Sequence, residues 1–109
     1  MRYYELREGD ADITRLRIFD PGVIAVQLDD FDPSLPTIEV DRIETRVEVQ
    51  CQGYGLAALN LLRDRFDTSQ VVAFSHADHF WKKTGFEKKR RTDGRVDGTA
   101  TFFVAPPLR

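Results

Sequence analysis

The most constraining feature of this sequence is a short glycine-bearing segment at which an extended pattern changes into a helical one. Residues 37–49 alternate with a period of two, which is typical of a β-strand. Residues 53–66 instead carry apolar side chains three and four positions apart, which predicts an amphipathic helix. The first N–H groups of a helix have no partners within it, and Gly53 and Gly55 leave the backbone open to close approach. This order of strand, glycine loop and helix predicts a phosphate-binding turn.

The first part of the chain is predicted to form strands over residues 3–7, 13–19 and 23–28. Asp20-Pro21-Gly22 is a turn sequence between the last two, so we expect residues 13–19 and 23–28 to pair as a β-hairpin. Within residues 37–49 the apolar positions change phase near Asp41 and Arg42. Such a slip indicates a β-bulge or a break in the strand.

The second part of the chain continues with a short apolar strand over residues 71–74. Because this run follows a strand–helix unit, we expect it to lie parallel to residues 37–49. Residues 77–84 predict a short helix, and Gly85 is a natural left-handed stop for it. Residues 86–91 and 99–105 flank a turn-rich stretch and predict a final antiparallel pair. The elements together predict a single mixed α/β (α+β) domain over residues 1–109.

Composition and length narrow the function classes. A chain of 109 residues has the usual size of one domain. No apolar run approaches the roughly 20 residues of a membrane helix, and the first residues have no apolar signal-peptide core, so we expect a cytoplasmic protein without a membrane partner. The net charge of −2 argues against a dedicated nucleic-acid binder.

The cysteine and histidine content argues against a metal site. Cys51 is the only cysteine, which excludes an internal disulfide and a four-cysteine zinc site. His76 and His79 are three residues apart, but two ligands without further histidines or cysteines make a poor site, so we expect no metal. Either histidine could instead act as an acid or a base, because the unperturbed pKa of histidine lies near neutrality.

A run of basic residues follows the second predicted helix. Lys82 and Lys83 are followed by four consecutive basic residues at 88–91. Three interpretations stay open: attraction of a phosphate-bearing ligand, a patch for nucleic acid or an acidic protein, and a solvated hairpin edge on which lysines block further strand pairing.

Two segments together resemble the GNAT superfamily of N-acetyltransferases. Gln50-Cys51-Gln52-Gly53-Tyr54-Gly55 is similar to its Gln/Arg-x-x-Gly-x-Gly/Ala signature. The segment from Ala77 to Phe86 is similar to its Ala-x-x-Phe-Tyr-x-x-x-Gly-Phe pattern, and the two lie in the family's order. The resemblance is sharp over residues 38–105. It implies the GNAT-like acyl-CoA N-acyltransferase fold, a mixed and mainly antiparallel sheet with two helices.

The resemblance also implies a ligand and a set of contacts. In that superfamily the glycine loop holds the pyrophosphate of acetyl-coenzyme A, and the backbone of the preceding strand pairs with the pantetheine. The residues that this places at the coenzyme are Val47, Val49, Gln50, Cys51, Gln52, Gly53, Tyr54, Gly55, Phe80 and Trp81. For Cys51 a small loop filler is the alternative to a reactive thiol at the helix start.

The candidate general bases lie on the polar face of the strand before the loop. Glu48 and Glu44 are carboxylates that could take a proton from an amine directly or through water, with Glu48 nearer the loop. The alternative is an ordinary exposed strand face.

The chain departs from the family pattern at two places. Family members carry one or two helices between the first two strands, where only about six residues separate Arg7 from Ile13 here. Trp81 stands where many members have the tyrosine that protonates the leaving thiolate, and an indole N–H is a donor that does not release its proton at neutral pH.

Two functions follow from the pattern and its departures. The first is transfer of an acetyl group from acetyl-coenzyme A to an amine of a small molecule or protein. The second is a catalytically degenerate GNAT-like module that binds a protein partner, for instance a host-directed module of a phage-type genome. In the family the helices that are missing here help to form the acceptor site. A homodimer could complete that site, and exposed strand edges would permit one.

Overall fold

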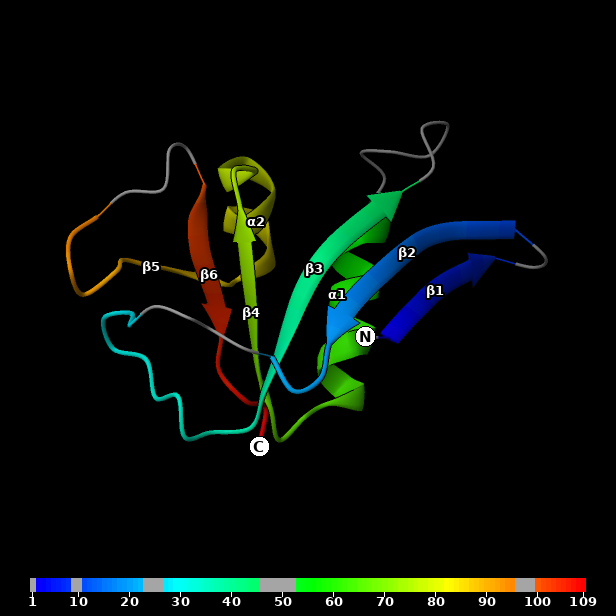
Figure 1. The fold of residues 1–109 in the computed structure, drawn as a ribbon. Coiled ribbons are helices and arrows are strands. Elements are labelled where there is room, and N and C mark those ends of the chain that lie inside the picture. Colours follow the sequence, from blue (N-terminus) through cyan, green and yellow to red (C-terminus); the bar gives the residue numbers. More distant parts are fainter. Residues whose placement is uncertain (1, 9–10, 23–26, 46–52, 96–99) are drawn as a thin grey trace.

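The alternating segments of the sequence pair into one sheet, and the two helical segments cover one of its faces. The computed structural model describes residues 2–8, 11–22, 27–45, 53–95 and 100–109. Its elements in chain order are β1 (Arg2–Glu8), β2 (Ala11–Phe19), β3 (Thr37–Thr45), α1 (Tyr54–Arg65), β4 (Gln70–Ser75), α2 (Asp78–Thr84), β5 (Glu87–Lys89) and β6 (Thr101–Ala105) (Figure 1). The strand order in the sheet is β1-β2-β3-β4-β6-β5.

The pairing directions confirm the predicted mixed and mainly antiparallel sheet. Within the described strands only the β3–β4 pair is parallel, as expected for a strand–helix–strand crossover. β1 and β2 pair antiparallel, and only two residues lie between them, too few for the helices that the family pattern has there. No helix in the described part of the chain is long and apolar enough to cross a membrane.

The phase slip in the third strand is a β-bulge, as predicted. In the β2–β3 pair Arg17 faces Arg42 while Ile18 faces Val40, so Asp41 is the extra residue. The bulge keeps Ile18 and Val40 in the core although the sequence alternation changes there. It also places the Asp41 side chain beside Arg17, with which it forms a hydrogen-bonded ion pair.

The main core lies between the sheet and the two helices. α1 contributes Ala58, Leu59 and Leu62, whose three- and four-residue spacing matches the helical period. The sheet contributes mainly branched and aromatic side chains, and α2 contributes Trp81. Gly85 ends α2 with a φ of +82°, which confirms the predicted left-handed stop.

A second, smaller apolar cluster covers part of the opposite face of the sheet, and it corrects one prediction. Leu28 is buried there against Val72 and Val104. It pairs across an isolated bridge with Arg91, beyond the end of β5. Both edges of β2 are occupied by β1 and β3, so the predicted hairpin of residues 13–19 with 23–28 is wrong. Residues 23–26 lie outside the described part.

The parallel pair β3–β4 separates along its length, and this separation positions the candidate site. The two strands pair over residues 37–40 and 70–73 only. Beyond these residues β3 continues to Thr45 and β4 to Ser75 without pairing with each other, and the two strands diverge towards their carboxyl ends in Figure 1. We call this opening the splay.

Candidate functional site

A cavity of about 550 Å³ lies at the splay. Its walls come from the diverging ends of β3 and β4, the first turn of α1, and α2. This volume falls in the range of small-molecule sites in proteins. The cavity lies where the carboxyl ends of parallel strands separate, which is a common ligand position in sheets of this kind.

The first turn of α1 gives one wall a positive electrostatic character. Gly53, at the N-cap, has a φ of +84° and offers no side chain to cap the helix. The first turn carries no acidic residue, whereas Arg63 and Arg65 lie in the last turn. The positive end of the helix dipole is therefore not neutralised by any described side chain of α1, and an anion would be stabilised there.

Five of the residues predicted to contact the coenzyme lie in the described part of the chain, and all five line this cavity. Gly53, Tyr54 and Gly55 line the cavity from α1, and Phe80 and Trp81 line it from α2. The other predicted contacts and the preferred base lie outside the described residues: Val47, Glu48, Val49, Gln50, Cys51 and Gln52. Their roles stay predictions.

Trp81 is a core residue whose surface reaches the cavity. Only 4% of it is exposed. Its ring stacks on Phe103, with centroids 5.7 Å apart and an interplanar angle of 16°, and it also contacts Phe80 and Phe86. The position that many GNAT proteins give to a proton-donating tyrosine therefore serves packing here.

Hydroxyl groups at the two ends of α2 accept and donate local hydrogen bonds. At its start the Ala77 N–H donates to Ser75 Oγ over 3.0 Å. At its end Thr84 Oγ1 donates to the Trp81 carbonyl over 2.6 Å and accepts from the Phe86 N–H over 3.2 Å. These bonds satisfy backbone groups at both ends of a short helix.

Of the acidic residues of β3, Asp41 lines the cavity, whereas Glu39 and Glu44 do not. Glu44 is exposed and pairs with Arg42 at 3.1 Å, and it is not part of the cavity wall. Asp41 does line the cavity, paired with Arg17. The hydrogen bond from Arg17 to Asp41 raises the pKa of that guanidinium. Burial, and then the neighbouring Asp41 charge, raises the pKa of Glu39.

Sequence reasoning missed much of the cavity wall, including Asp41, Arg42 and Phe74. The phase slip pointed to Asp41 as a bulge without indicating that the bulge lies at the splay. Phe74 looked like the last residue of a buried strand, but it is 45% exposed on the face of the sheet opposite the helices, where the second apolar cluster covers only part of the surface.

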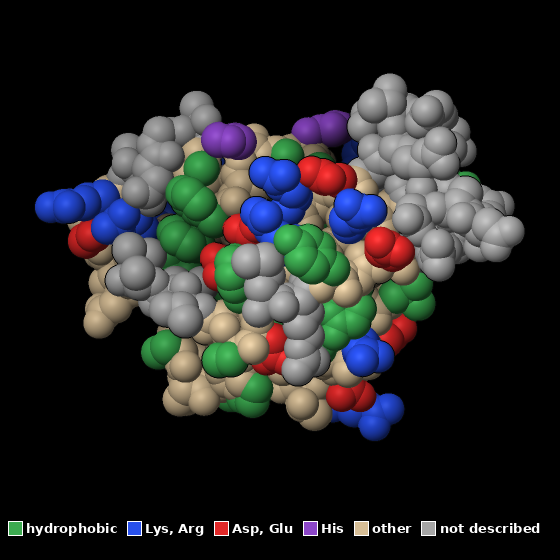
Figure 2. All heavy atoms as spheres, turned by 45° about the vertical axis from the view of Figure 1, so that its right-hand side comes forward, with side chains coloured by type: hydrophobic (Ala, Val, Ile, Leu, Met, Phe, Trp, Pro, Cys, Tyr) green, Lys and Arg blue, Asp and Glu red, His purple; other side chains and the backbone are tan. Residues whose placement is uncertain are grey.

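Three residues of the basic run pair with nearby acidic residues. Lys88 pairs with Asp78 at 3.1 Å, Lys89 with Glu87 at 3.2 Å, and Arg91 with Asp93 at 2.9 Å. Lys83 lines the cavity from α2. On the face shown in Figure 2, acidic and basic side chains are interspersed, with hydrophobic side chains beside them.

The histidines do not meet further metal-ligating groups. His79 lines the cavity, and both histidines are exposed. Among the described residues, no group of three or more His, Cys, Asp or Glu side chains is arranged to hold a metal ion.

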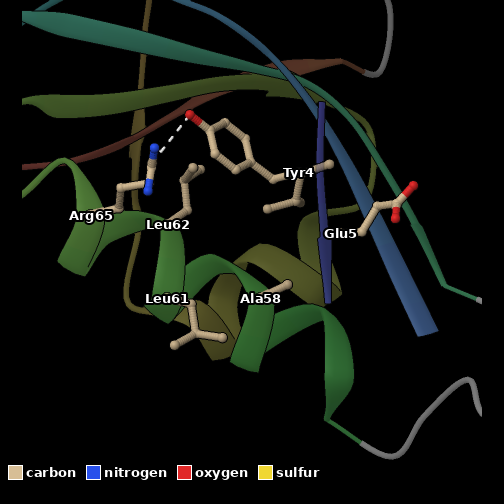
Figure 3. A pocket seen from close by; sticks show the side chains of 7 residues that line it. Tyr4, Glu5, Ala58, Leu61, Leu62 and Arg65 are labelled. Carbon is tan, nitrogen blue, oxygen red and sulfur yellow. Dashed lines mark hydrogen bonds between the residues drawn. The ribbon is translucent and has the colours of Figure 1, made fainter. Parts of the chain in front are cut away.

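A second, smaller pocket of about 130 Å³ lies between β1 and α1, apart from the splay (Figure 3). Arg65 Nε donates to the Tyr4 hydroxyl over 3.3 Å, and its guanidinium lies 5.2 Å from the Tyr4 ring centre. Leu61 is 57% exposed beside it. The polar side chains that line this pocket are Glu5 and the Arg65–Tyr4 pair.

Comparison with known proteins finds similar structures and no similar sequence family. No protein-family model and no curated protein sequence matches the chain. The Bacillus subtilis N-acetyltransferase YlbP, solved in complex with coenzyme A, superimposes with a TM-score of 0.72 at 19% identity, over 96% of this chain and 67% of that one. The Escherichia coli ribosomal-protein-S18-alanine N-acetyltransferase superimposes with a TM-score of 0.67 at 17% identity, over 99% of this chain and 70% of that one.

A GNAT-family protein from Desulfovibrio desulfuricans gives a TM-score of 0.66 at 14% identity, over 95% of this chain and 67% of its own. The chain thus spans about two thirds of the length of these proteins. At such identities the likeness establishes the fold, and the activity has to be argued from the site.

Proposed function

We propose that this chain, which has the fold of the GNAT N-acetyltransferases, binds acetyl-coenzyme A at the splay and transfers its acetyl group to an amine. The observation that carries the proposal is the cavity between β3 and β4, bounded by the acid-free first turn of α1. A phosphate-bearing thioester fits this combination because one end of the site favours an anion while the interior is largely apolar.

In this proposal the pyrophosphate lies at the start of α1, against Gly53 and Gly55. Glycine at these positions lets the phosphate oxygens approach backbone N–H groups. The pantetheine then runs towards the splay, where Phe80 and Trp81 offer apolar contacts. The coenzyme A complex of the Bacillus subtilis neighbour supports this choice of ligand.

The chemical step joins the acceptor nitrogen to the acetyl carbon. The amine must be neutral to attack, so a base takes its proton, and Glu48, Glu44 or water are the candidates. The nitrogen adds to the thioester carbonyl carbon and gives up a further proton to water, the carbon–sulfur bond breaks, and the sulfur leaves as a thiolate. Trp81 is not an acid at neutral pH, so the thiolate takes its proton from water.

The buried state of Trp81 also favours a second function. A ring held by Phe103, Phe86 and Phe80 stabilises the fold whether or not acetyl transfer takes place. The second proposal is therefore a GNAT-like binding module with a protein partner and no turnover. We also propose that the protein is located in the cytoplasm and that it forms a homodimer. Gel filtration with light scattering tests the homodimer.

The direct test is release of free thiol from acetyl-coenzyme A with and without added amines. The proposed activity predicts amine-dependent thiol release above the rate of spontaneous hydrolysis. The matched controls are Gly53→Glu, which places a negative charge at the phosphate end, and Leu61→Gln, which changes an exposed side chain outside the cavity. Wild-type thiol release that does not rise with added amine would contradict the proposed activity and favour the binding module, whereas equal amine-dependent rates for all three proteins would contradict a phosphate site at Gly53.

A further inference from the structure

The two edges of the sheet differ in how open they are to further pairing. β5 forms one edge, has three residues and carries Lys88 and Lys89. Short edge strands that carry lysines resist the addition of another strand. β1 forms the other edge, has seven residues without proline, and pairs with β2 alone among the described strands (Figure 1). The outward N–H and C=O groups of β1 are therefore available to a further strand.

The smaller pocket lies beside this open edge strand. Tyr4 of β1 borders it on one side, and Leu61 and Arg65 of α1 border it on the other (Figure 3). Both helix residues are exposed. The pocket shares no lining residue with the cavity at the splay, so it is a separate surface. We call it the edge pocket.

The edge pocket has one positive charge that is not balanced. The Arg65 guanidinium lies 5.2 Å from the Tyr4 ring centre and its Nε donates to the Tyr4 hydroxyl, but it forms no ion pair with any described residue. Glu5, the acid that lines the same pocket, is paired with Arg15 at 3.6 Å. An oriented cation beside an apolar hollow favours a partner that brings an acidic side chain.

The direction of α1 sets the level of each pocket residue along β1. β1 and β3 are both antiparallel to β2, and α1 returns from the end of β3 to the start of β4, so α1 runs against β1. Arg65 therefore lies at the level of Tyr4, and Leu61 lies further towards the carboxyl end of β1. Four helical residues rise about 6 Å, close to the roughly 6.8 Å between alternate residues of a strand.

The sequence of β1 supplies a matching pattern of an apolar residue and an acid two positions later. Tyr4, Leu6 and Glu8 occupy alternate positions of the strand. In an antiparallel pair of two β1 strands centred on Leu6, Leu6 lies opposite its own copy and Glu8 lies opposite Tyr4. Glu5 then lies opposite Arg7. A pair centred on Glu5 would instead place two carboxylates opposite each other, which is destabilising.

We propose that β1 pairs antiparallel with β1 of a second copy in the register centred on Leu6, which joins the two sheets into one. Leu6 of each copy then contacts Leu61 of the other, and Glu8 of each copy pairs with Arg65 of the other. Such an interface is isologous, so every contact occurs twice. This inference rests on the proposed homodimer and specifies its interface. It does not depend on acetyl transfer, because the edge pocket is separate from the cavity at the splay.

Charge reversal tests the proposed ion pair. Sedimentation velocity at low salt measures the dimer dissociation constant of the wild type, Arg65→Glu, Glu8→Arg and the double variant. Each single variant should raise this constant by about tenfold or more, because two attractive pairs become repulsive. The double variant should restore the dimer, since both pairs form again with their charges exchanged. Lys82→Glu makes the same charge change at an exposed residue outside both pockets and should leave the constant unchanged.

A cysteine cross-link tests the register. Residues directly opposite in an antiparallel pair have Cβ atoms about 4.5–5.5 Å apart, so a small adjustment allows a disulfide. Under mild oxidation Leu6→Cys should give a cross-linked dimer. Glu5→Cys, the centre of the competing register, should give no more cross-linking than the wild type, which shares the native Cys51 with both variants.

The outcomes separate the interface from the proposed function. A wild type that stays monomeric into the millimolar range would overturn the interface together with the homodimer. A dimer that both single charge reversals leave intact, or that the double variant does not restore, would overturn this interface alone. Cross-linking through Glu5→Cys and not Leu6→Cys would overturn the register and the pairing of Glu8 with Arg65. Thiol release by the wild type is measured independently, so acetyl transfer can fail while the interface stands, or the reverse.

Discussion

Replacing Gly53 by glutamate or by glutamine separates the charge at the start of α1 from its shape. Gly53 has a φ of +84°, so either side chain costs about 1–2 kcal/mol of backbone strain. A Cβ at this position meets no described atom within 4 Å, so the strain is the main steric cost. The two variants differ by one negative charge at a helix N-terminus, which stabilises by about 0.3–1 kcal/mol. The glutamate variant is therefore expected to be more stable than the glutamine variant in urea denaturation.

The affinity for coenzyme A is expected to follow the opposite order. A carboxylate at about 6 Å from a doubly charged pyrophosphate costs about 1.4 kcal/mol even at the dielectric constant of water, which weakens binding about tenfold. Calorimetric titration at low salt measures this difference between Gly53→Glu and Gly53→Gln. If the two variants bind coenzyme A equally, no phosphate lies near the start of α1, and the reasoning is refuted.

Three further predictions concern stability. Gln70→Ala removes the buried amide that donates hydrogen bonds to the Asp32 carbonyl and to Thr37 Oγ1, each over 2.8 Å. The free energy of unfolding in urea should fall by about 1–3 kcal/mol, and a fall below about 0.5 kcal/mol would show that these two hydrogen bonds contribute little. Glu39 has a folded-state pKa raised above its ordinary value of 4.5, so its proton stabilises the fold fully below pH 4.5, and this contribution is lost as pH rises through the folded pKa. Glu39→Gln should therefore raise Tm at pH 7 and not at pH 3.5, whereas an equal rise at both would exclude this cause. Trp81→Ala should cost about 3–5 kcal/mol, and a cost near 1 kcal/mol would show that its aromatic stack is not a tightly packed part of the core.

Local sequence patterns were sufficient to predict the part of the fold that surrounds the splay. The bulge at Asp41 followed from the change of phase, α1 from its apolar spacing, and the left-handed residue Gly85 from the end of the second helix. The parallel β3–β4 pair followed from the handedness of strand–helix–strand connections. These features depend on neighbouring residues or on connectivity, which the sequence states directly.

The placement of Leu28 could not be read in the same way. An apolar run after a turn is consistent with a hairpin partner and with a segment that covers the second face of the sheet. The choice depends on β1 and β3, which occupy both edges of β2. That competition between distant strands is a tertiary effect, and the local sequence pattern is the same in both cases.

The cavity wall at the start of α1 was predictable from the sequence, and the wall at Phe74 was not. The glycines at the start of α1 carry a motif, and Gly53 and Gly55 do line the cavity. Phe74 lies on the face opposite the helices, where the second apolar cluster covers only part of the sheet, and it is exposed there. The three interpretations of the basic run stay open, although Lys88 and Lys89 pair with acids on α2 and β5 and do not line the cavity.

Titration of coenzyme A into the chain at low and at moderate salt tests the central claim most directly. A phosphate site at the start of α1 predicts micromolar binding that weakens as salt rises, because salt screens the interaction between the phosphates and the helix end. Absence of binding into the millimolar range at low salt would contradict the account and would leave a GNAT fold without its coenzyme.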